Sequence, residues 1–472
     1  MHESPSSRGL KYARSSLGVA AALVALLALA GGAHANGALP GSSGILLPAD
    51  HPQQITLATN FGLIISQDGG ASWLWSCERP EISFGYLYSL SSPPRDRIYG
   101  LANTAGPSSI DDGWLAYSDD GSCTWTRVRG TLQDVVVRDY FVDRTNTDHV
   151  LAVGWAMQAS GDPGPPLLFE STDAAATFSG TPLYTGAANA SVVSIEIARS
   201  NPMVVYMAMY TTPDRHPRLL RSNDGGKTWP LDRDVEAGIG AHEFRILTVD
   251  PANSDVLYLR VIGLGTESVV VTRDAGMTFT TAVTVTPGVL SAFLRLASGT
   301  VLVGGLVNLD GGGGGMAGVA YRSTDGGNSF VPWTLTSQQP HILGLAERGS
   351  VLYIAGKNYS DGWALATSRD EGVTIQPLSR YEDVRGIMPC AMNMCGDQCQ
   401  LVASQAVWTN DVCTGALLDG GTALDAGPPD AGPPPPPKSG CHCSAAGVPG
   451  ANLVAWIFVA AALALRRRHH RR

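Results

Sequence analysis

Residues 222–229 read SNDGGKTW, and close copies of this octapeptide recur along the chain. The other copies are SQDGGASW at 66, SDDGSCTW at 118, STDAAATF at 171, TRDAGMTF at 272, STDGGNSF at 323 and SRDEGVTI at 368. Each has an aspartate at its third position: Asp68, Asp120, Asp173, Asp224, Asp274, Asp325 and Asp370. Successive aspartates lie 45 to 53 residues apart, and a regular period of this size indicates supersecondary units that are stacked or arranged in a ring.

Residues 244–285 show what one unit contains. Three β-rich runs, 244–249, 256–262 and 268–272, are separated by turn residues, and a fourth begins at Thr278. The octapeptide follows the third run, so it is predicted to be the hairpin between strands three and four of an antiparallel meander. Almost no long helical pattern occurs between residues 40 and 418. High glycine content and short, even strands predict an all-β protein, a β-propeller with four-stranded blades.

The octapeptide has the residues that a tight hairpin needs. The carboxylate of Asp224 is expected to accept hydrogen bonds from turn N–H groups, with Ser222 and Thr228 as hydroxyl partners. Glycines supply positive φ angles. The aromatic residue at the end is expected to enter the fourth strand and pack between units: Trp73, Trp125, Phe178, Trp229, Phe279 and Phe330. The copy at 171 lacks both glycines and the copy at 368 ends in isoleucine, so these two turns are expected to be looser.

This pattern, Ser/Thr-x-Asp-x-Gly-x-Thr/Ser-Trp/Phe, resembles the Asp box of the bacterial neuraminidase repeat. The resemblance extends over residues 44 to about 380 and includes sialidase-like, photosystem-assembly-factor-like and xyloglucanase-like propellers. It implies that the seven aspartates are scaffold residues on the blade periphery, away from the central cleft. The cysteine-rich segment 385–418 is either a decayed eighth blade or an extension that caps the ring; seven blades are favoured, with eight as the alternative.

Both ends of the chain carry targeting signals. Residues 1–35 have basic residues, an apolar run and an AHA motif, which are typical of a secretory signal peptide. The propeller, 36–418, is followed by a Pro/Gly/Asp-rich linker, 419–440, expected to be an extended spacer. Residues 441–472 resemble a myxobacterial C-terminal sorting tail, which implies processing by a sorting protease near Cys441 and display at the cell surface. The alternative is an ordinary single-span membrane anchor.

Charge and cysteine content narrow the classes of partner. The net charge is −9, and residues 36–418 alone carry about −14. Proteins that bind nucleic acid have a basic surface, so this acidic charge argues against a nucleic-acid partner. Glycan or protein partners of the envelope or the extracellular space remain.

Cysteines of an exported chain are expected to form disulfides. Cys77 is predicted to pair with Cys123, and the cluster Cys390, Cys395, Cys399 and Cys413 allows three pairings, with a zinc site as the less favoured alternative.

No catalytic residues are identified by motif. A sialidase has an arginine in a Phe/Tyr-Arg-Ile-Pro context, and the nearest string here, FRIL at 244, has Leu247 in place of the proline. HEFR at 242 lacks the second histidine of a zinc-protease helix. A glycoside hydrolase needs two facing carboxylates. Acids outside the octapeptides supply candidates but single out no pair: Asp111, Asp112, Asp139, Glu196, Glu243, Glu267, Asp361, Glu382 and Asp383.

The sequence therefore favours a non-catalytic binding module of the cell envelope, without cofactor or metal. The alternative is a glycoside hydrolase that acts on an extracellular polysaccharide. Two segments, 155–169 and 308–315, are expected to be variable loops that would form a binding face.

Overall fold

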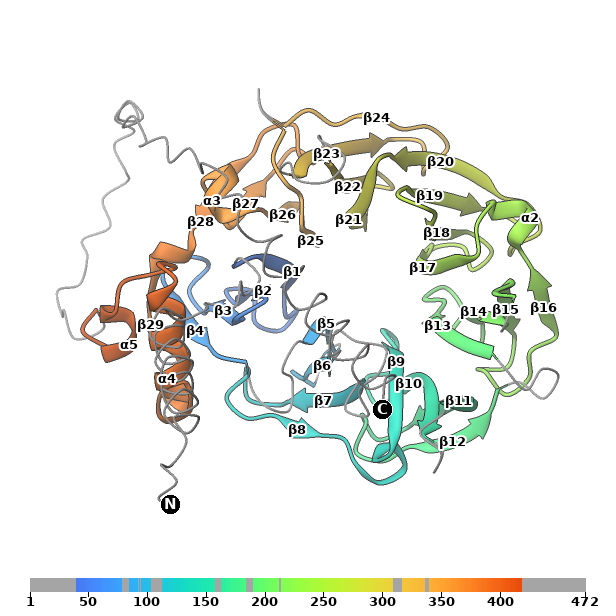
Figure 1. Cartoon of the computed structure of the whole chain (residues 1–472), viewed down its shortest axis with the longest axis horizontal. Coiled ribbons are helices and arrows are strands. Elements are labelled where there is room, and N and C mark those ends of the chain that lie inside the picture. The colour runs from blue at the N-terminus through green and yellow to red at the C-terminus, as the bar shows by residue number, and fades with distance from the viewer. Residues whose placement is uncertain are drawn as a thin grey trace, which may run out of the picture. The chain divides into compact units, whose positions relative to one another are not determined.

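The chain forms a ring of seven β-sheets (Figure 1). The computed structural model describes residues 40–417 except 79–84, 92, 94, 103–112, 158–162, 184–189, 212–213, 309–315 and 336–338. Six sheets have four antiparallel strands and one has a fifth strand, so the predicted seven-bladed propeller is confirmed. In each sheet the strands follow one another in chain order, with the first strand nearest the centre of the ring and the fourth at its rim.

The blades are numbered from the N-terminal end. Blade 1 contains β1 (Ser42–Leu46), β2 (Ile55–Thr59), β3 (Gly62–Ser66) and β4 (Trp73–Ser76), and blade 2 contains β5 (Gly85–Leu90), β6 (Ile98–Ala102), β7 (Trp114–Ser118) and β8 (Thr126–Arg127). Blade 3 contains β9 (Val135–Val142), β10 (Val150–Met157), β11 (Pro163–Ser171) and β12 (Ser179–Pro182). Blade 4 contains β13 (Ala190–Ile197), β14 (Val205–Thr211), β15 (Pro217–Ser222) and β16 (Leu231–Asp234).

Blades 5 to 7 have the same plan. Blade 5 contains β17 (Glu243–Val249), β18 (Leu257–Ile262), β19 (Glu267–Thr272) and β20 (Thr280–Val285). Blade 6 contains β21 (Gly288–Arg295), β22 (Val301–Asn308), β23 (Met316–Ser323) and β24 (Val331–Pro332). Blade 7 contains β25 (Gly344–Arg348), β26 (Val351–Ala355), β27 (Leu365–Ser368) and β28 (Gln376–Ser379). Short helical turns lie between or after strands: η1 (Gly130–Leu132), α2 (Glu236–Ile239), α3 (Asn358–Asp361), η2 (Tyr381–Asp383) and η3 (Pro389–Ala391). In blade 5 the predicted strands are found within one or two residues of their expected bounds.

One predicted loop is largely sheet. The segment 155–169 was expected to be a variable loop, but β10 continues to Met157 and β11 begins at Pro163, so most of it is a lengthened hairpin. The reason is cross-strand pairing, which extends to Trp155 opposite Pro166 and beyond a bulge to Met157 opposite Pro163. The other expected loop, 308–315, lies outside the described residues except for Asn308, the last residue of β22.

The antiparallel meander gives the ring two distinct faces. The turn between strands one and two and the octapeptide between strands three and four lie at the same end of each blade, and we call this side the octapeptide face. Backbone hydrogen bonds join the two turns, for example Gly225 N to Met203 O at 2.9 Å and Ala275 N to Asp255 O at 2.9 Å. The loops between strands two and three and the links between blades lie at the other end, the loop face.

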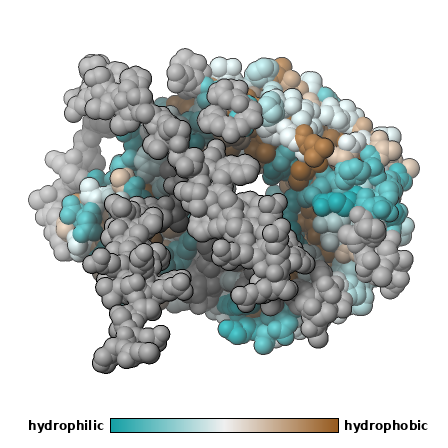
Figure 2. All heavy atoms as spheres, in the orientation of Figure 1, coloured by the Kyte–Doolittle hydropathy of each residue, from teal (hydrophilic) through white to brown (hydrophobic). Residues whose placement is uncertain are grey.

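The hydrophobic core is divided among the blade interfaces. One cluster combines Leu151 and Leu168 of blade 3 with Val205 and Met207 of blade 4, and comparable clusters lie between the other neighbouring blades. Each sheet therefore buries both of its faces against neighbours, which is why no single unit is expected to be stable alone. In the view of Figure 2, apolar residues of the described blades appear at the surface in small groups among hydrophilic ones.

The segment after blade 7 closes the ring. β29 (Val384–Ile387) runs parallel to β4 and adds a fifth strand to blade 1, so it covers the outer edge of that sheet. It is followed by α4 (Met392–Ser404) and α5 (Asp411–Thr414), which pack against blade 1. We call residues 384–414 the clasp. An eighth blade is therefore not formed, and the alternative of an extension that caps seven blades is the correct one.

The predicted signal peptide, linker and C-terminal tail with Cys441 fall on 1–39 and 418–472, outside the described residues. Among the residues that are described, no helix has the length and apolarity to cross a membrane.

Candidate functional site

The octapeptide aspartates are held by hydrogen bonds inside their own turns. In blade 4, Asp224 Oδ1 accepts the Ser222 hydroxyl at 2.7 Å and the Thr228 N–H at 2.8 Å, and Oδ2 accepts the Thr228 hydroxyl at 2.6 Å. The bond from the Thr228 hydroxyl contributes most to lowering the pKa of Asp224 to about 2. The pKa values of the other six aspartates, Asp68, Asp120, Asp173, Asp274, Asp325 and Asp370, are lowered as well. These carboxylates are permanently charged acceptors of the scaffold, which leaves little capacity for a substrate or an ion.

The expectation of looser turns at 171 and 368 is wrong. Asp173 accepts the Thr177 N–H at 2.8 Å and its hydroxyl at 2.5 Å, and Asp370 makes the same two bonds at 2.9 and 2.7 Å. Both central positions have positive φ angles in every blade, whatever the residue. The pairs are Gly69 and Gly70, Gly121 and Ser122, Ala174 and Ala175, Gly225 and Gly226, Ala275 and Gly276, Gly326 and Gly327, and Glu371 and Gly372.

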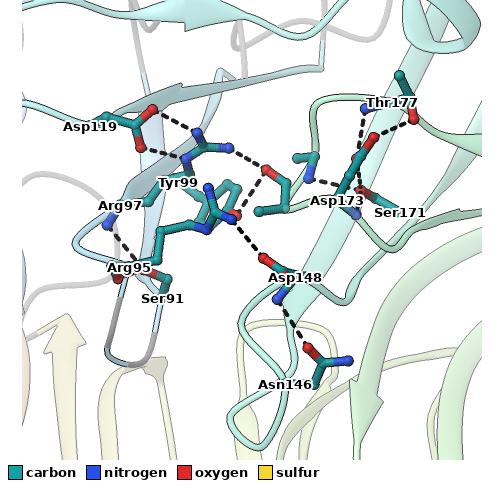
Figure 3. A network of polar contacts seen from close by, with 12 residues as sticks. Ser91, Arg95, Arg97, Tyr99, Asp119, Asn146, Asp148, Ser171, Asp173 and Thr177 are labelled. Carbon is teal, nitrogen blue, oxygen red and sulfur yellow. Dashed lines mark hydrogen bonds and ion pairs between the residues drawn. The ribbon is translucent and has the colours of Figure 1, made fainter.

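Contacts from blade 2 hold the turn that lacks glycine (Figure 3). The guanidinium of Arg97 and the hydroxyl of Tyr99 both donate to the carbonyl oxygen of Ala174, and Arg97 also forms a bidentate ion pair with Asp119, with N–O distances of 2.6 Å. Arg95 binds Asp148 of blade 3 at 2.7 Å. The bonds from Arg97 and Tyr99 to Ala174 offset the strain of its left-handed backbone conformation. Because their donors lie outside the octapeptide, the octapeptide sequence alone does not reveal them.

The aromatic residues lie just before the fourth strand in most blades. Only Trp73 begins its strand, whereas Trp125, Phe178, Phe279 and Phe330 each precede theirs by one residue and Trp229 precedes β16 by two. Phe178 belongs to the core shared by blades 2 and 3, and Trp229 packs on that shared by blades 3 and 4. In blade 7, Ile375 packs on the core shared with blade 6.

The disulfides connect the clasp to two blades, and the predicted pairing of Cys77 with Cys123 is wrong. Cys77 pairs with Cys395 and Cys123 with Cys390, and only Cys399–Cys413 lies within the predicted four-cysteine cluster. The two N-terminal cysteines are indeed close, because Ser76 and Ser122 contact each other through a 2.9 Å hydrogen bond. The clasp crosses this position and supplies a partner for each.

Two candidate acids of the first strands are deeply buried. Asp139 of β9 and Glu196 of β13 are each 8% exposed. Asp139 accepts the Ile195 N–H of blade 4 at 2.9 Å, and Glu196 accepts the Val249 N–H of blade 5 at 2.7 Å and the Thr248 hydroxyl at 2.9 Å. Burial raises the pKa of Asp139 to about 6 and that of Glu196 to about 7. Each therefore joins its blade to the next one.

The other candidate acids also have protein partners. Glu243 pairs with Arg215; Glu267 with Arg260 and the Leu290 N–H; Asp361 with His341 and the Lys357 N–H; Glu382 with Asn358; and Asp383 with the Arg380 N–H. Asp111 and Asp112 lie outside the described residues. Arg245 of the FRIL string donates to the Val193 carbonyl at 3.1 Å. Each of these acids in the described part of the chain has a protein partner, and these contacts single out no catalytic pair.

Two groups of side chains have the composition of a metal site. Asp50, His51 and Asp96 lie on the octapeptide face, and His216, Asp234 and Glu236 lie on the loop face between blades 4 and 5. His242, which the sequence leaves without a second histidine, also contacts Glu236, at 3.3 Å from Nδ1 to Oε1. A second imidazole near Glu236 comes from His216, in the loop before β15 and far from His242 in sequence, so a search for local motifs could not find it.

Comparisons with solved structures return propellers of several kinds. The chain is similar to the GH74 xyloglucanase from Xanthomonas campestris, with 14% identity over 72% of this chain and 71% of that one and a TM-score of 0.34. YCF48 from Cyanidioschyzon merolae has 15% identity over 67% and 93%, with a TM-score of 0.42. The Hadza microbial sialidase Hz136 has 15% identity over 64% and 71%, with a TM-score of 0.41. No family model and no curated protein matches the chain.

Proposed function

We propose that this protein is an exported propeller, tethered to the cell surface by its C-terminal tail, which binds an envelope or extracellular glycan or protein without turnover. The observation that carries this proposal is the state of the acids. Each described candidate carboxylate accepts hydrogen bonds or ion pairs that hold a turn, a loop or a blade interface, which favours a structural role for these acids over acid–base chemistry.

Three features support the cellular placement. The N-terminal segment has the composition of a secretory signal, and the C-terminal segment has a spacer, an apolar stretch and terminal arginines. The three disulfides of the described residues fit an oxidising compartment outside the cytoplasm. Labelling of intact cells with an antibody against the propeller tests the placement, and a Cys441→Ala chain is expected to lose surface retention.

The second candidate function is a glycoside hydrolase, and one observation favours it. Asp139 and Glu196 come from adjacent blades and have raised pKa values, a property typical of catalytic acids. Their bonds to backbone N–H groups of the next blade favour the structural interpretation instead.

The deciding experiment is a screen of the full chain against labelled polysaccharides and sialosides, with hydrolysis and pull-down read from the same wells. Binding without hydrolysis supports the proposal. Hydrolysis that disappears in Glu196→Gln or Asp139→Asn, while binding remains, overturns it in favour of the hydrolase. Absence of both binding and hydrolysis, repeated with envelope protein extracts, overturns it in favour of a purely structural role.

A further inference from the structure

Three side chains, those of His216, Asp234 and His242, lie around the carboxylate of Glu236 on the loop face. His216 precedes β15, Asp234 ends β16, Glu236 begins α2, and His242 precedes β17. The two oxygens of Glu236 each face an imidazole: Oε2 lies 2.8 Å from His216 Nδ1, and Oε1 lies 3.3 Å from His242 Nδ1. Asp234 Oδ2 lies 3.8 Å from the same nitrogen of His216. We call these four residues the loop-face cluster.

The backbone beneath the loop-face cluster is fixed. Val235 donates its N–H to the Pro217 carbonyl at 3.0 Å, which holds the end of β16 beside the start of β15. The single turn α2 is anchored by the buried side chains of Val235 and Ile239, which belong to the core between blades 4 and 5. The Glu236 N–H donates to Asp234 Oδ1 at 3.0 Å, which holds the Asp234 carboxylate beside the start of α2. The donors therefore extend from ordered segments rather than from a free loop.

Imidazole nitrogen and carboxylate oxygen are ligands that Zn²⁺ takes in proteins, usually four in number. Nitrogen donors favour first-row divalent ions over Ca²⁺ and Mg²⁺, which prefer oxygen alone. We propose that the loop-face cluster binds a Zn²⁺-class divalent ion through His216, Asp234 and Glu236, whose ligand atoms lie within 4.8 Å of one another, with His242 as the fourth ligand. The ion joins the loop between β14 and β15 to the link between β16 and β17. This inference does not rest on the proposed function.

The chain contains its own control. The group of Asp50, His51 and Asp96 has two carboxylates but a single imidazole, so it is expected to bind Zn²⁺ much more weakly. The tail histidines, His469 and His470, are a second possible source of Zn²⁺ binding, so every variant is also prepared with both changed to alanine.

The test is calorimetric titration of the full chain, purified without a polyhistidine tag, with ZnCl₂ and separately with CaCl₂. His216→Ala and His242→Ala are each expected to weaken Zn²⁺ binding at least tenfold, whereas His51→Ala leaves it unchanged. The imidazoles of His216 and His242 are 47% and 64% exposed, so neither substitution is expected to unfold the blade. A second readout is thermal unfolding, in which Zn²⁺ raises Tm for the parent chain but not for the His216→Ala/His242→Ala double variant.

Three results would overturn the inference. The double variant binds Zn²⁺ as tightly as the parent, binding follows His51 instead, or Ca²⁺ displaces Zn²⁺ at equal concentration. Any of these would show that the loop-face cluster is not a Zn²⁺-class site.

Discussion

At the scale of single residues, two kinds of carboxylate have opposite environments. The octapeptide aspartates lie at the surface and are stabilised as anions by the hydrogen bonds of their turns, which lower their pKa values. Asp139 and Glu196 lie in the interior, where burial favours the protonated form and raises their pKa values. Both kinds have a structural role in this ring, and they respond to pH in different ranges.

Glu196 is expected to make the protein less stable as pH rises from about 4.5 to about 7. The ordinary pKa of this carboxyl is 4.5 and its folded value is about 7, so in this interval the unfolded chain ionises while the folded chain keeps the proton. The loss is about 3 kcal/mol above pH 7. Glu196→Gln keeps an oxygen that can accept the Val249 N–H and cannot ionise, so its unfolding free energy should lack this decrease.

Urea unfolding of both chains at pH 5 and pH 8 measures the difference. His149 and His341 titrate in both chains, so the comparison between chains cancels their contribution. An equal decrease in the two chains would show that Glu196 is ionised in the folded protein.

The left-handed turn positions can be tested in blade 4. Gly225 has φ +75° and nothing within 4 Å of an added Cβ, so Gly225→Ala isolates the cost of the backbone conformation, about 1 kcal/mol. Gly226→Ala should cost more, because its Cβ would lie 2.8 Å from Leu168 Cδ2. The control is Gly396 in α4, where the space is also open but φ is ordinary, and alanine should stabilise by about 0.5 to 1 kcal/mol. Equal unfolding midpoints for Gly225→Ala and Gly396→Ala would contradict this account.

At the scale of elements, the sequence predicts those strands and turns that a local residue pattern specifies. Alternating apolar residues and turn chemistry give the strands of residues 243–285 within one or two positions, because each hairpin is specified by its own few residues. An extension that caps the ring was predicted for the segment of the clasp, but its strand β29 and helices α4 and α5 were not. α4 has a weak apolar pattern, because its buried residues, Cys395, Cys399 and Val402, include two cysteines that the sequence identifies only as disulfide candidates. Their partners depend on which blades the clasp crosses, a tertiary property without a local signal.

The two disulfides that join the clasp to blades 1 and 2 are expected to compensate for each other when one is removed. Cys77–Cys395 closes 318 residues and Cys123–Cys390 closes 267, and either bond keeps the clasp beside blades 1 and 2 when the other is absent. Cys395→Ser and Cys390→Ser should therefore each have a moderate cost, while the double variant costs more than their sum and exceeds about 4 kcal/mol.

The measurement is urea unfolding under oxidising conditions, with limited proteolysis of the clasp as a second readout. Cys413→Ser is the control, because Cys399–Cys413 closes only 14 residues inside the clasp and should not affect its docking on blade 1. Strictly additive single and double effects would mean that the two bonds do not hold the same element.

At the scale of the whole molecule, six seams join blades that follow one another in the chain, and the seventh joins blade 7 to blade 1. Blades 1 and 7 are far apart in sequence, so their seam is joined by side-chain contacts and by the clasp. Ser42 Oγ and Tyr381 Oη lie 2.9 Å apart across it, and an added Cβ on Gly344 would lie 3.1 Å from Gly44 Cα, so the first strands approach closely. The octapeptide period predicts a ring and its number of blades, but long-range contacts alone determine how the ring closes.

Arg348 of β25 forms hydrogen bonds directly across this seam. Its guanidinium donates to three carbonyl oxygens of blade 1: Pro52 at 2.7 Å, Pro48 at 3.1 Å and Gln54 at 2.6 Å. Arg348→Ala leaves all three without this donor and should lower the unfolding free energy by about 2 to 4 kcal/mol, because hydrogen bonds from charged groups are strong. Arg348→Lys retains the charge and should recover part of the loss.

The matched control is Arg322, which crosses the seam between blades 6 and 7 to Glu371 as a half-exposed ion pair at 2.8 Å. Arg322→Ala should cost no more than about 1 kcal/mol, since partly exposed ion pairs contribute little to stability. Opening of the ring adds a second signature, because the loss of Arg348 should expose the blade 1 and blade 7 strands to amide hydrogen exchange before the other blades. Uniform exchange around the ring in Arg348→Ala would show that the clasp alone keeps the seam closed.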